Sequence, residues 1–432
     1  MEITRPHSSK YYRTERCVHA YLLFMILMFT LIPIRNNLFY YPYAISDWLI
    51  NYQGGFVRRG LIGEVFHLLY EIHPYDVRYL IIFINVTCFL CFLTFAHKVF
   101  RKHGWSMIPL LLPISCCVLP LLFYRRDFPM LLICAAVFYL TAAYVKNKSK
   151  RCLAYSIIVM SLLTLIYEPS FFVFFPISAL MLWQTSKGAT WHKIVRVSCY
   201  LSLPLICMLS VVVANGTGDT AEKIWRSWQE LFVTFPDGKE IGKLGEGVNF
   251  MERSIVEVFI FHLDKNFGIL SWPSVSSILN NIAWMMTMTG TYFLVTHVPV
   301  IDTKSHKLKP NTQKELLGSL FIFQCLMTLP MFTVLSCDHG RVVLYCIFST
   351  FILAHLYIKN KNILFLPPPI IQLNKHIIRK MNGAGWTGLP IVYFLSVMLI
   401  PYVSTPSPTL TDNILVHMTE KFLFLCDKYL NV

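Results

Sequence analysis

The sequence predicts an all-α protein, one integral membrane domain over residues 1–432 that crosses the membrane about eleven times. Hydrophobic residues make up 55% of the chain and charged residues only 14%, whereas soluble proteins average about 25% charged residues. Several apolar runs reach the roughly 17–25 residues that a helix needs to cross a hydrocarbon core about 30 Å thick. Short basic segments separate these runs, which is typical of polytopic membrane proteins.

The expected spans follow from these runs in chain order. They are 18–34, 79–96, 107–123, 128–145, 152–166, 171–185, 197–214, 278–298, 315–335, 342–358 and 386–403.

The distribution of Lys and Arg orients these spans. With residues 1–17 in the cytoplasm, the segments placed inside hold 23 of the 38 Lys and Arg residues and those placed outside hold 15. Six of these 15 lie in the long segment 215–277, where the bias carries least weight. The sequence therefore predicts a cytoplasmic N-terminus and an external C-terminus. The same asymmetry explains the net charge of +15, so we expect no nucleic-acid partner.

Two external segments are larger than simple turns, residues 35–78 and residues 215–277. Apolar residues recur at helical spacing in 61–72 and in 220–235, so we expect an amphipathic helix at the membrane interface in each segment.

The most polar stretch near a span is DWLINYQGGFVRRGLIGE, residues 47–64. It contains Asp47, Arg58, Arg59, Glu64 and four glycines. Charged groups at a membrane edge are costly unless they are paired, which makes this stretch a candidate for function.

The short external turns carry further charged residues. These are Arg125, Arg126 and Asp127 before residue 128, Glu168 after residue 166, and Asp338, His339 and Arg341 before residue 342. Because all of them fall on the predicted external side, we expect them to converge with residues 47–64 on one cavity.

These residue types suit a substrate that carries phosphate. Arginine presents a planar fork of donors to phosphate oxygens, and neighbouring glycines let the backbone approach closely. A carboxylate can act as a general base or hold a divalent metal ion. Phosphate and carboxylate chemistry at a membrane interface predicts a sugar carried on a lipid phosphate or pyrophosphate, with an acid deprotonating the acceptor hydroxyl.

Structural explanations stand beside each of these interpretations. Residues 54–60 could form a turn whose arginines reach lipid headgroups, and no Gly-Lys-Ser/Thr follows to make a P-loop. Residues 125–127 could be a salt-bridged turn, and Glu168 before Pro169 could end a helix. Asp338 and Arg341 are spaced for a local ion pair.

An acid in the first external segment, followed by Arg125-Arg126-Asp127 at a later external turn, resembles the polytopic GT-C-type glycosyltransferases. The overall form is similar to O-antigen polymerases of bacterial surface-polysaccharide assembly. The resemblance implies polyprenyl-linked sugar donors, Asp47 as the catalytic base and Asp127 as a metal or phosphate ligand. The sequence has no Asp-x-Asp pair, so no cofactor is certain and a divalent metal is the one left open.

We therefore expect a glycosyltransferase or polymerase in a bacterial inner membrane, acting on lipid-linked sugars at the periplasmic face, in contact with membrane lipids and with other polysaccharide-assembly proteins. Asp47 and Glu168 are the further catalytic candidates beside Asp127. The candidates for phosphate or substrate binding are Arg58, Arg59, Arg125, Arg126, Asp338, His339 and Arg341.

Three other functions remain open. A transporter or flippase for lipid-linked oligosaccharide would require charges within spans or repeated halves, and the sequence shows neither. A non-enzymatic envelope scaffold would leave the external acids dispensable. An acyltransferase would use His297 and Asp302, but Pro299 interrupts that spacing and the segment is predicted to be cytoplasmic.

Overall fold

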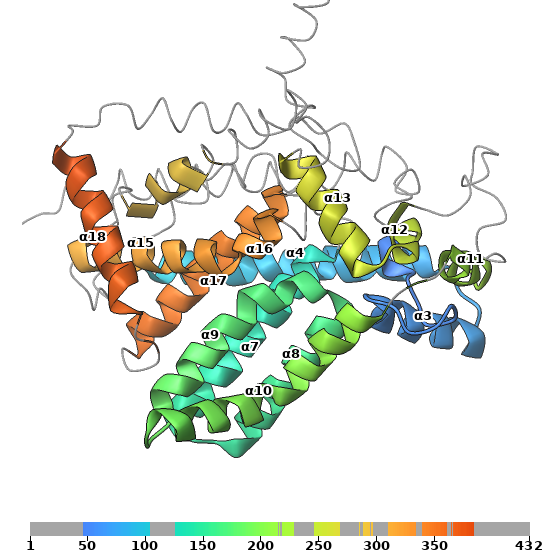
Figure 1. The fold of residues 1–432 in the computed structure, drawn as a ribbon, viewed down its shortest axis with the longest axis horizontal. Helices are drawn as coiled ribbons and strands as arrows, with labels where there is room; N and C mark the ends of the chain where they lie inside the picture. The colour runs from blue at the N-terminus through green and yellow to red at the C-terminus, as the bar shows by residue number, and fades with distance from the viewer. Residues whose placement is uncertain are drawn as a thin grey trace, which may run out of the picture.

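The structure is a computed structural model. It describes residues 46–103, 126–214, 216, 218–228, 246–267, 285, 288–293, 295–296, 310–333, 339–360, 364 and 366–383. Within these residues every regular element is a helix (Figure 1). This confirms the all-α membrane fold. The expected spans 18–34, 107–123 and 386–403 lie outside the described residues, and 278–298 is described only in part.

The centre of the molecule is a bundle of long apolar helices. In chain order they are α4 (Val77–Lys102), α7 (Asp127–Asn147), α8 (Lys150–Ile166), α9 (Phe171–Thr185), α10 (Thr190–Val213) and α17 (His339–Lys359). Each contains one of the expected spans. Among the described residues, four helices are long and apolar enough to cross a membrane, in α4, α7, α10 and α17, whereas α8 and α9 are shorter.

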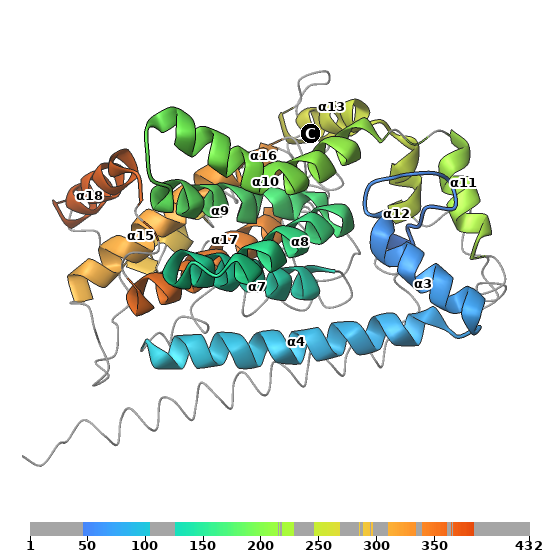
Figure 2. The ribbon, with the colours of Figure 1, turned by 90° about the horizontal axis from the view of Figure 1, so that it is seen from below.

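Short turns set the antiparallel path of this bundle. Helix α7 is capped by the following residue, Lys148, which adopts the left-handed conformation at φ 56° and donates its N–H to the Tyr144 carbonyl. The next residue, Ser149, caps α8 by accepting the N–H of Cys152, as serine commonly does at this position. Gly188, at φ 106°, makes the turn between α9 and α10. The two turns place α7, α8, α9 and α10 side by side (Figure 2).

Burial separates central from peripheral helices. In the most apolar window of α17, 89% of the residues are buried within the protein, against 22% in α10 and 28% in α4. Helix α17 packs on α4, α7, α9 and α15 (Pro310–Met327). The apolar side chains that α4 and α10 expose are suited to contact with lipid.

One end of α4 carries a compact cap built from the described parts of segments 35–78 and 215–277 (Figures 1 and 2). It contains α3 (Gly60–Ile72), α11 (Gly218–Arg226), α12 (Glu246–Asn249) and the 3₁₀ helix η5 (Phe250–Glu252). The helix expected in 61–72 is confirmed as α3, and α11 covers the first part of the helix expected in 220–235. Two small hydrophobic clusters hold the segments together, one around Trp48 and Trp228 and the other around Ile50 and Ile224.

The opposite end of the molecule holds α18 (Pro368–Gly383), which packs on α15 (Pro310–Met327). The expected span 315–335 is not one continuous helix, because α15 ends at Met327 and α16 (Leu329–Thr333) begins after Thr328. Pro330 explains the break, since proline has no backbone N–H and its ring clashes with the preceding turn. Helix α13 (Ile255–Phe267) packs beside α16.

Candidate functional site

The candidate site begins in the loop between residues 46 and 59. Trp48, Leu49 and Ile50 are buried in the cap, which anchors the backbone next to Asp47. The chain then turns at Gly55, whose N–H donates to the Tyr52 carbonyl. Arg59 ends the loop at φ 62°, a left-handed conformation uncommon for a residue other than glycine. The fold therefore imposes a backbone cost of about 1–3 kcal/mol to aim the Arg59 side chain.

Arg126 joins this loop to the start of α7. Its Nε and Nη2 atoms contact the two carboxylate oxygens of Asp47 at 2.9 and 2.7 Å. Its remaining N–H groups donate to backbone carbonyls of Asp47, Arg59 and Ile166. An arginine side chain has five N–H donors, so all of them are used, and the side chain is fully buried. Arg126, expected to bind substrate, therefore has no donor left for a phosphate in this arrangement.

Arg59 lies between the two carboxylates of the site. Its Nε and Nη2 atoms donate to Glu168 at 2.7–3.0 Å, and its Nη1 atom lies 3.5 Å from Asp47 Oδ1. The guanidinium carbon sits 5.2 Å from the centre of the Tyr167 ring, a cation–π contact. The Arg59 side chain is 18% exposed, against 0–7% for Arg126, Asp47 and Glu168. Arg59 is the most accessible charge of the four.

The four groups alternate in sign, so the cluster as a whole is neutral. Burial by itself raises the pKa of Glu168, but the adjacent Arg59 guanidinium and the charge of Arg58 outweigh burial and hold that pKa below its ordinary value. Burial by itself lowers the pKa of Arg59, whereas Glu168 and Asp47 raise it, and the net effect is a raised pKa. Both side chains are therefore ionised at neutral pH.

The described part of segment 215–277 packs against the loop of residues 46–59. The Gly247 N–H donates to Ser46 Oγ at 3.3 Å, and Trp228 Nε1 donates to the Leu49 carbonyl at 2.9 Å. A Cβ atom at Gly247 would lie only 3.0 Å from the Asp47 backbone nitrogen. These contacts could not be predicted, because nothing in the sequence pairs position 247 with position 47.

The comparisons with known proteins place the chain in a family. A family model described as uncharacterised membrane protein Rv1490 matches residues 12–236, just over half of the chain. The chain belongs to this Rv1490 membrane protein family. No curated protein and no solved structure matches the chain. The match supports a membrane protein and does not extend to GT-C glycosyltransferases or O-antigen polymerases.

The matched range of this Rv1490-family protein contains the whole ionic cluster, Asp47, Arg59, Arg126 and Glu168. Three segments distant along the chain, the loop with Asp47 and Arg59, the start of α7 and the turn with Glu168, thus meet at the same end of the bundle. Helix α17 lies outside the matched range but also reaches the site, because its Tyr345 ring stacks on Tyr167 with centroids 6.3 Å apart.

The other expected site residues of the Rv1490-family protein lie around this cluster or outside the described residues. Arg58 is buried and interacts electrostatically with Glu168. Asp127 is buried at the first residue of α7. Arg125 and Asp338 lie outside the described residues, and of His339 and Arg341 only the backbone, in the first turn of α17, is described.

No group of three or more His, Cys, Asp or Glu side chains in the described part of the chain is placed to hold a metal ion. The divalent metal considered from the sequence therefore remains untested.

Proposed function

We propose that this protein transfers a sugar from a lipid-linked phosphate or pyrophosphate donor to a hydroxyl acceptor on the extracytoplasmic side of the membrane. The observation that carries the proposal is the convergence of Asp47, Arg59, Arg126 and Glu168, from three separate segments, at one end of a membrane-embedded bundle. Arrays of buried charge of this kind are costly to build and cluster at functional sites.

In the proposal, Arg59 binds the donor phosphate. Three of its five N–H groups are engaged by Glu168 and Asp47 within the described residues, which leaves two to donate to phosphate oxygens. Glu168 holds the guanidinium in place through both carboxylate oxygens. Arg58, on the same short loop, adds positive charge beside Glu168.

Asp47 acts as the general base in the proposal. The acceptor oxygen attacks the anomeric carbon of the donor, the bond from that carbon to the phosphate oxygen breaks, and the lipid phosphate leaves. Asp47 takes the proton of the acceptor hydroxyl. The 3.5 Å contact between Arg59 Nη1 and Asp47 is the longest in the cluster, so an arriving phosphate displaces it first. With Arg59 drawn to the phosphate, the Asp47 carboxylate loses one stabilising charge and becomes more basic.

A structural clamp is the competing explanation, and one observation favours it. Arg126 uses all its donors on protein atoms and holds Asp47 through both carboxylate oxygens. A cluster that only fastened the first external segment to α7 and α8 would need nothing more. In that case the accessible N–H groups of Arg59 would have no role.

Arg59→Lys separates the two explanations, because lysine keeps the charge and loses the fork that binds phosphate and carboxylate together. Full-length protein in proteoliposomes would receive a mixture of tritiated glucosyl-, galactosyl- and mannosyl-undecaprenyl phosphate together with a membrane extract as acceptor. Release of undecaprenyl phosphate, a product common to all three donors, would be measured. We expect R59K to lose about 100-fold in rate, as removal of a charge-stabilising donor typically does.

The matched control is Arg78→Lys, which alters another arginine–aspartate pair, with Asp76, at the external end of α4. We expect R78K to transfer sugar at the wild-type rate. Wild-type release by an R59K protein with an unchanged melting temperature would reject Arg59 as the phosphate-binding residue. Absence of release by the wild-type protein would reject the transferase and leave the clamp.

A further inference from the structure

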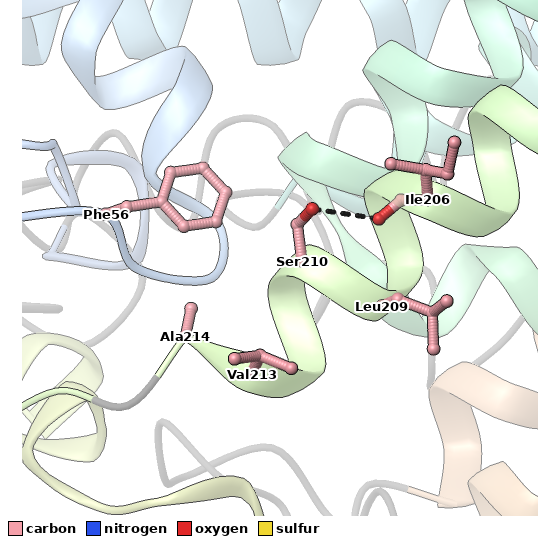
Figure 3. A pocket seen from close by; sticks show the side chains of 6 residues that line it. All are labelled: Phe56, Ile206, Leu209, Ser210, Val213 and Ala214. Carbon is pink, nitrogen blue, oxygen red and sulfur yellow. Dashed lines mark hydrogen bonds between the residues drawn. The ribbon is translucent and has the colours of Figure 1, made fainter.

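An open cavity of about 700 Å³ lies between the site loop, residues 46–59, and the last turns of α10 (Figure 3). Phe56 forms one wall, and residues of α10 and the residue that follows it form the other. The lining residues are Phe56, Ile206, Leu209, Ser210, Val213 and Ala214. We call this cavity the Phe56 groove.

The lining of the Phe56 groove is almost entirely apolar. The one hydroxyl in its lining, Ser210 Oγ, donates to the Ile206 carbonyl at 2.9 Å, and this bond is drawn in Figure 3. Phe56, Leu209 and Val213 are about half exposed or more. A hydrocarbon chain would cover these surfaces without leaving any polar group unpaired.

The groove wall and the ionic cluster share the loop of residues 46–59, which contains both Phe56 and Arg59. The Phe56 ring stacks on Tyr52 with centroids 5.3 Å apart. The Tyr52 N–H donates to Glu64 at 2.8 Å, and Gly60 leaves room for the Tyr52 ring. Phe56 precedes Arg59 by only three residues, so a molecule with an apolar chain in the groove can place its head at the arginine.

We propose that the Phe56 groove binds the hydrocarbon chain of the lipid whose phosphate contacts Arg59. This assignment rests on the proposed function for the identity of the lipid, a polyprenyl phosphate, and gives that substrate a second point of attachment. A chain held in the groove would position the anomeric carbon in front of Asp47. The groove would also explain why an exposed phenylalanine stands so close to two arginines.

Photo-crosslinking tests the groove without depending on turnover. The probe is an undecaprenyl phosphate with a diazirine along its chain, added to full-length protein in phosphatidylcholine proteoliposomes. Peptide mass spectrometry would locate the label. We expect labelling at Phe56 and in residues 206–214, competed by unlabelled undecaprenyl phosphate and unaffected by the same amount of phosphatidylglycerol.

Leu209→Trp fills the groove, and Leu203→Trp is its matched control, because Leu203 is 45% exposed on α10 and does not line the groove. We expect L209W to reduce groove labelling about tenfold through lost apolar contact, and L203W to leave it unchanged. Labelling spread over the exposed face of α10, or equal competition by phosphatidylglycerol, would show that ordinary bilayer lipid fills the groove and would overturn the assignment.

The groove and the sugar transfer can fail separately. Specific labelling of the groove with no release of undecaprenyl phosphate by wild-type protein would retain the lipid site and reject the transferase. Release that depends on Arg59, with labelling unaltered by L209W, would retain the transferase and reject the groove.

Discussion

Two arginines of the site differ in what their side chains can still do. Arg126 is fully buried with every N–H group donating to protein oxygen atoms. Arg59 is partly exposed and keeps donors for a ligand. Burial and hydrogen bonding therefore show that Arg126 holds the site together, and they support our proposal that Arg59 binds the donor phosphate, although the sequence presents both simply as arginines beside apolar runs.

Arg126→Ala should destabilise the protein strongly. It removes the partner of the buried Asp47 carboxylate and leaves three backbone carbonyls without their donor, so we expect a loss of about 3–5 kcal/mol in unfolding free energy. Denaturant titration in detergent would measure this loss. Arg78→Ala, in a more exposed pair, should cost about 1 kcal/mol or less. Equal stabilities for the two variants would contradict the assignment of Arg126.

The ionisation of Glu168 should make the stability of the folded protein depend on pH in the acid range. Its pKa is held below its ordinary value by Arg59, so its ionised form stabilises the folded state. That contribution is complete above the ordinary value of 4.5 and is lost as the pH falls below 4.5 through the lowered folded-state pKa. Melting temperatures of wild type and Glu168→Gln should differ most near pH 7 and converge below pH 4.5. A gap independent of pH would contradict this linkage.

The ionisable residues of the site could be identified from the sequence, because charges are conspicuous in a chain of which only 14% is charged. It could not identify their backbone partners. The carbonyls of Asp47, Arg59 and Ile166 become acceptors for Arg126 only through the fold.

Among the elements, the cap built from α3, α11, α12 and η5 determines the position of Asp47. Three hydrogen bonds join the part of the cap from segment 215–277 to the part from segment 35–78. They link Gly247 to Ser46, Trp228 to Leu49, and Ser227 to Asn51. The two segments thus form one unit, although the hydrogen-bonded residues lie 176 to 201 positions apart along the chain.

Gly247→Ala tests whether this support matters for the site. The new Cβ would lie 2.9 Å from Ser46 Oγ and 3.0 Å from the Asp47 nitrogen, so the Asp47 backbone must shift, at a cost of about 1–3 kcal/mol. We expect a reduced rate of undecaprenyl phosphate release, since a small displacement of a base lowers rates sharply.

Gly188→Ala is the matched control for this variant. Gly188 has a positive φ in the α9–α10 turn, so alanine there costs about 1–2 kcal/mol without touching the site. Its rate should equal that of the wild type. Equal rates for both variants would show that the cap does not position Asp47.

The prediction of elements from sequence succeeded where apolar runs were long and ended in turn residues, as in α4, α7 and α10. It was wrong for 315–335, where the apolar run continues through Pro330 but the hydrogen-bonded helix does not. Hydropathy measures the solvent preference of side chains and carries no information on a missing backbone donor.

The whole molecule has two structurally different ends along the direction of α4. The cap lies at one end and α18 at the other (Figures 1 and 2). The all-α membrane fold was predictable from composition and periodicity alone. From the sequence one could predict only that the charged residues of the cluster share one side of the membrane, because counts of Lys and Arg predict sidedness. The distances between these residues depend on how the helices pack.

The orientation of the molecule can be measured directly. We predict that the turn at Gly188 faces the cytoplasm and that Asp76, before α4, faces outward, because basic residues concentrate on the predicted inner side. A protease recognition sequence inserted after Gly188 should be cut only in inverted vesicles, and one inserted after Asp76 only in spheroplasts, where the periplasmic face is accessible. The reverse pattern would place the ionic cluster in the cytoplasm and exclude an extracytoplasmic reaction.

The contacts of Arg126 also impose an order on biosynthesis. The loop with Asp47 and Arg59 leaves the ribosome well before Arg126 does, and the Ile166 carbonyl that takes another of its N–H groups follows later still. During insertion the loop therefore lacks its contacts with Arg126 until the start of α7 has been synthesised. The site is completed by late-synthesised partners, so premature chain termination before α8 would yield inserted helices without an assembled centre.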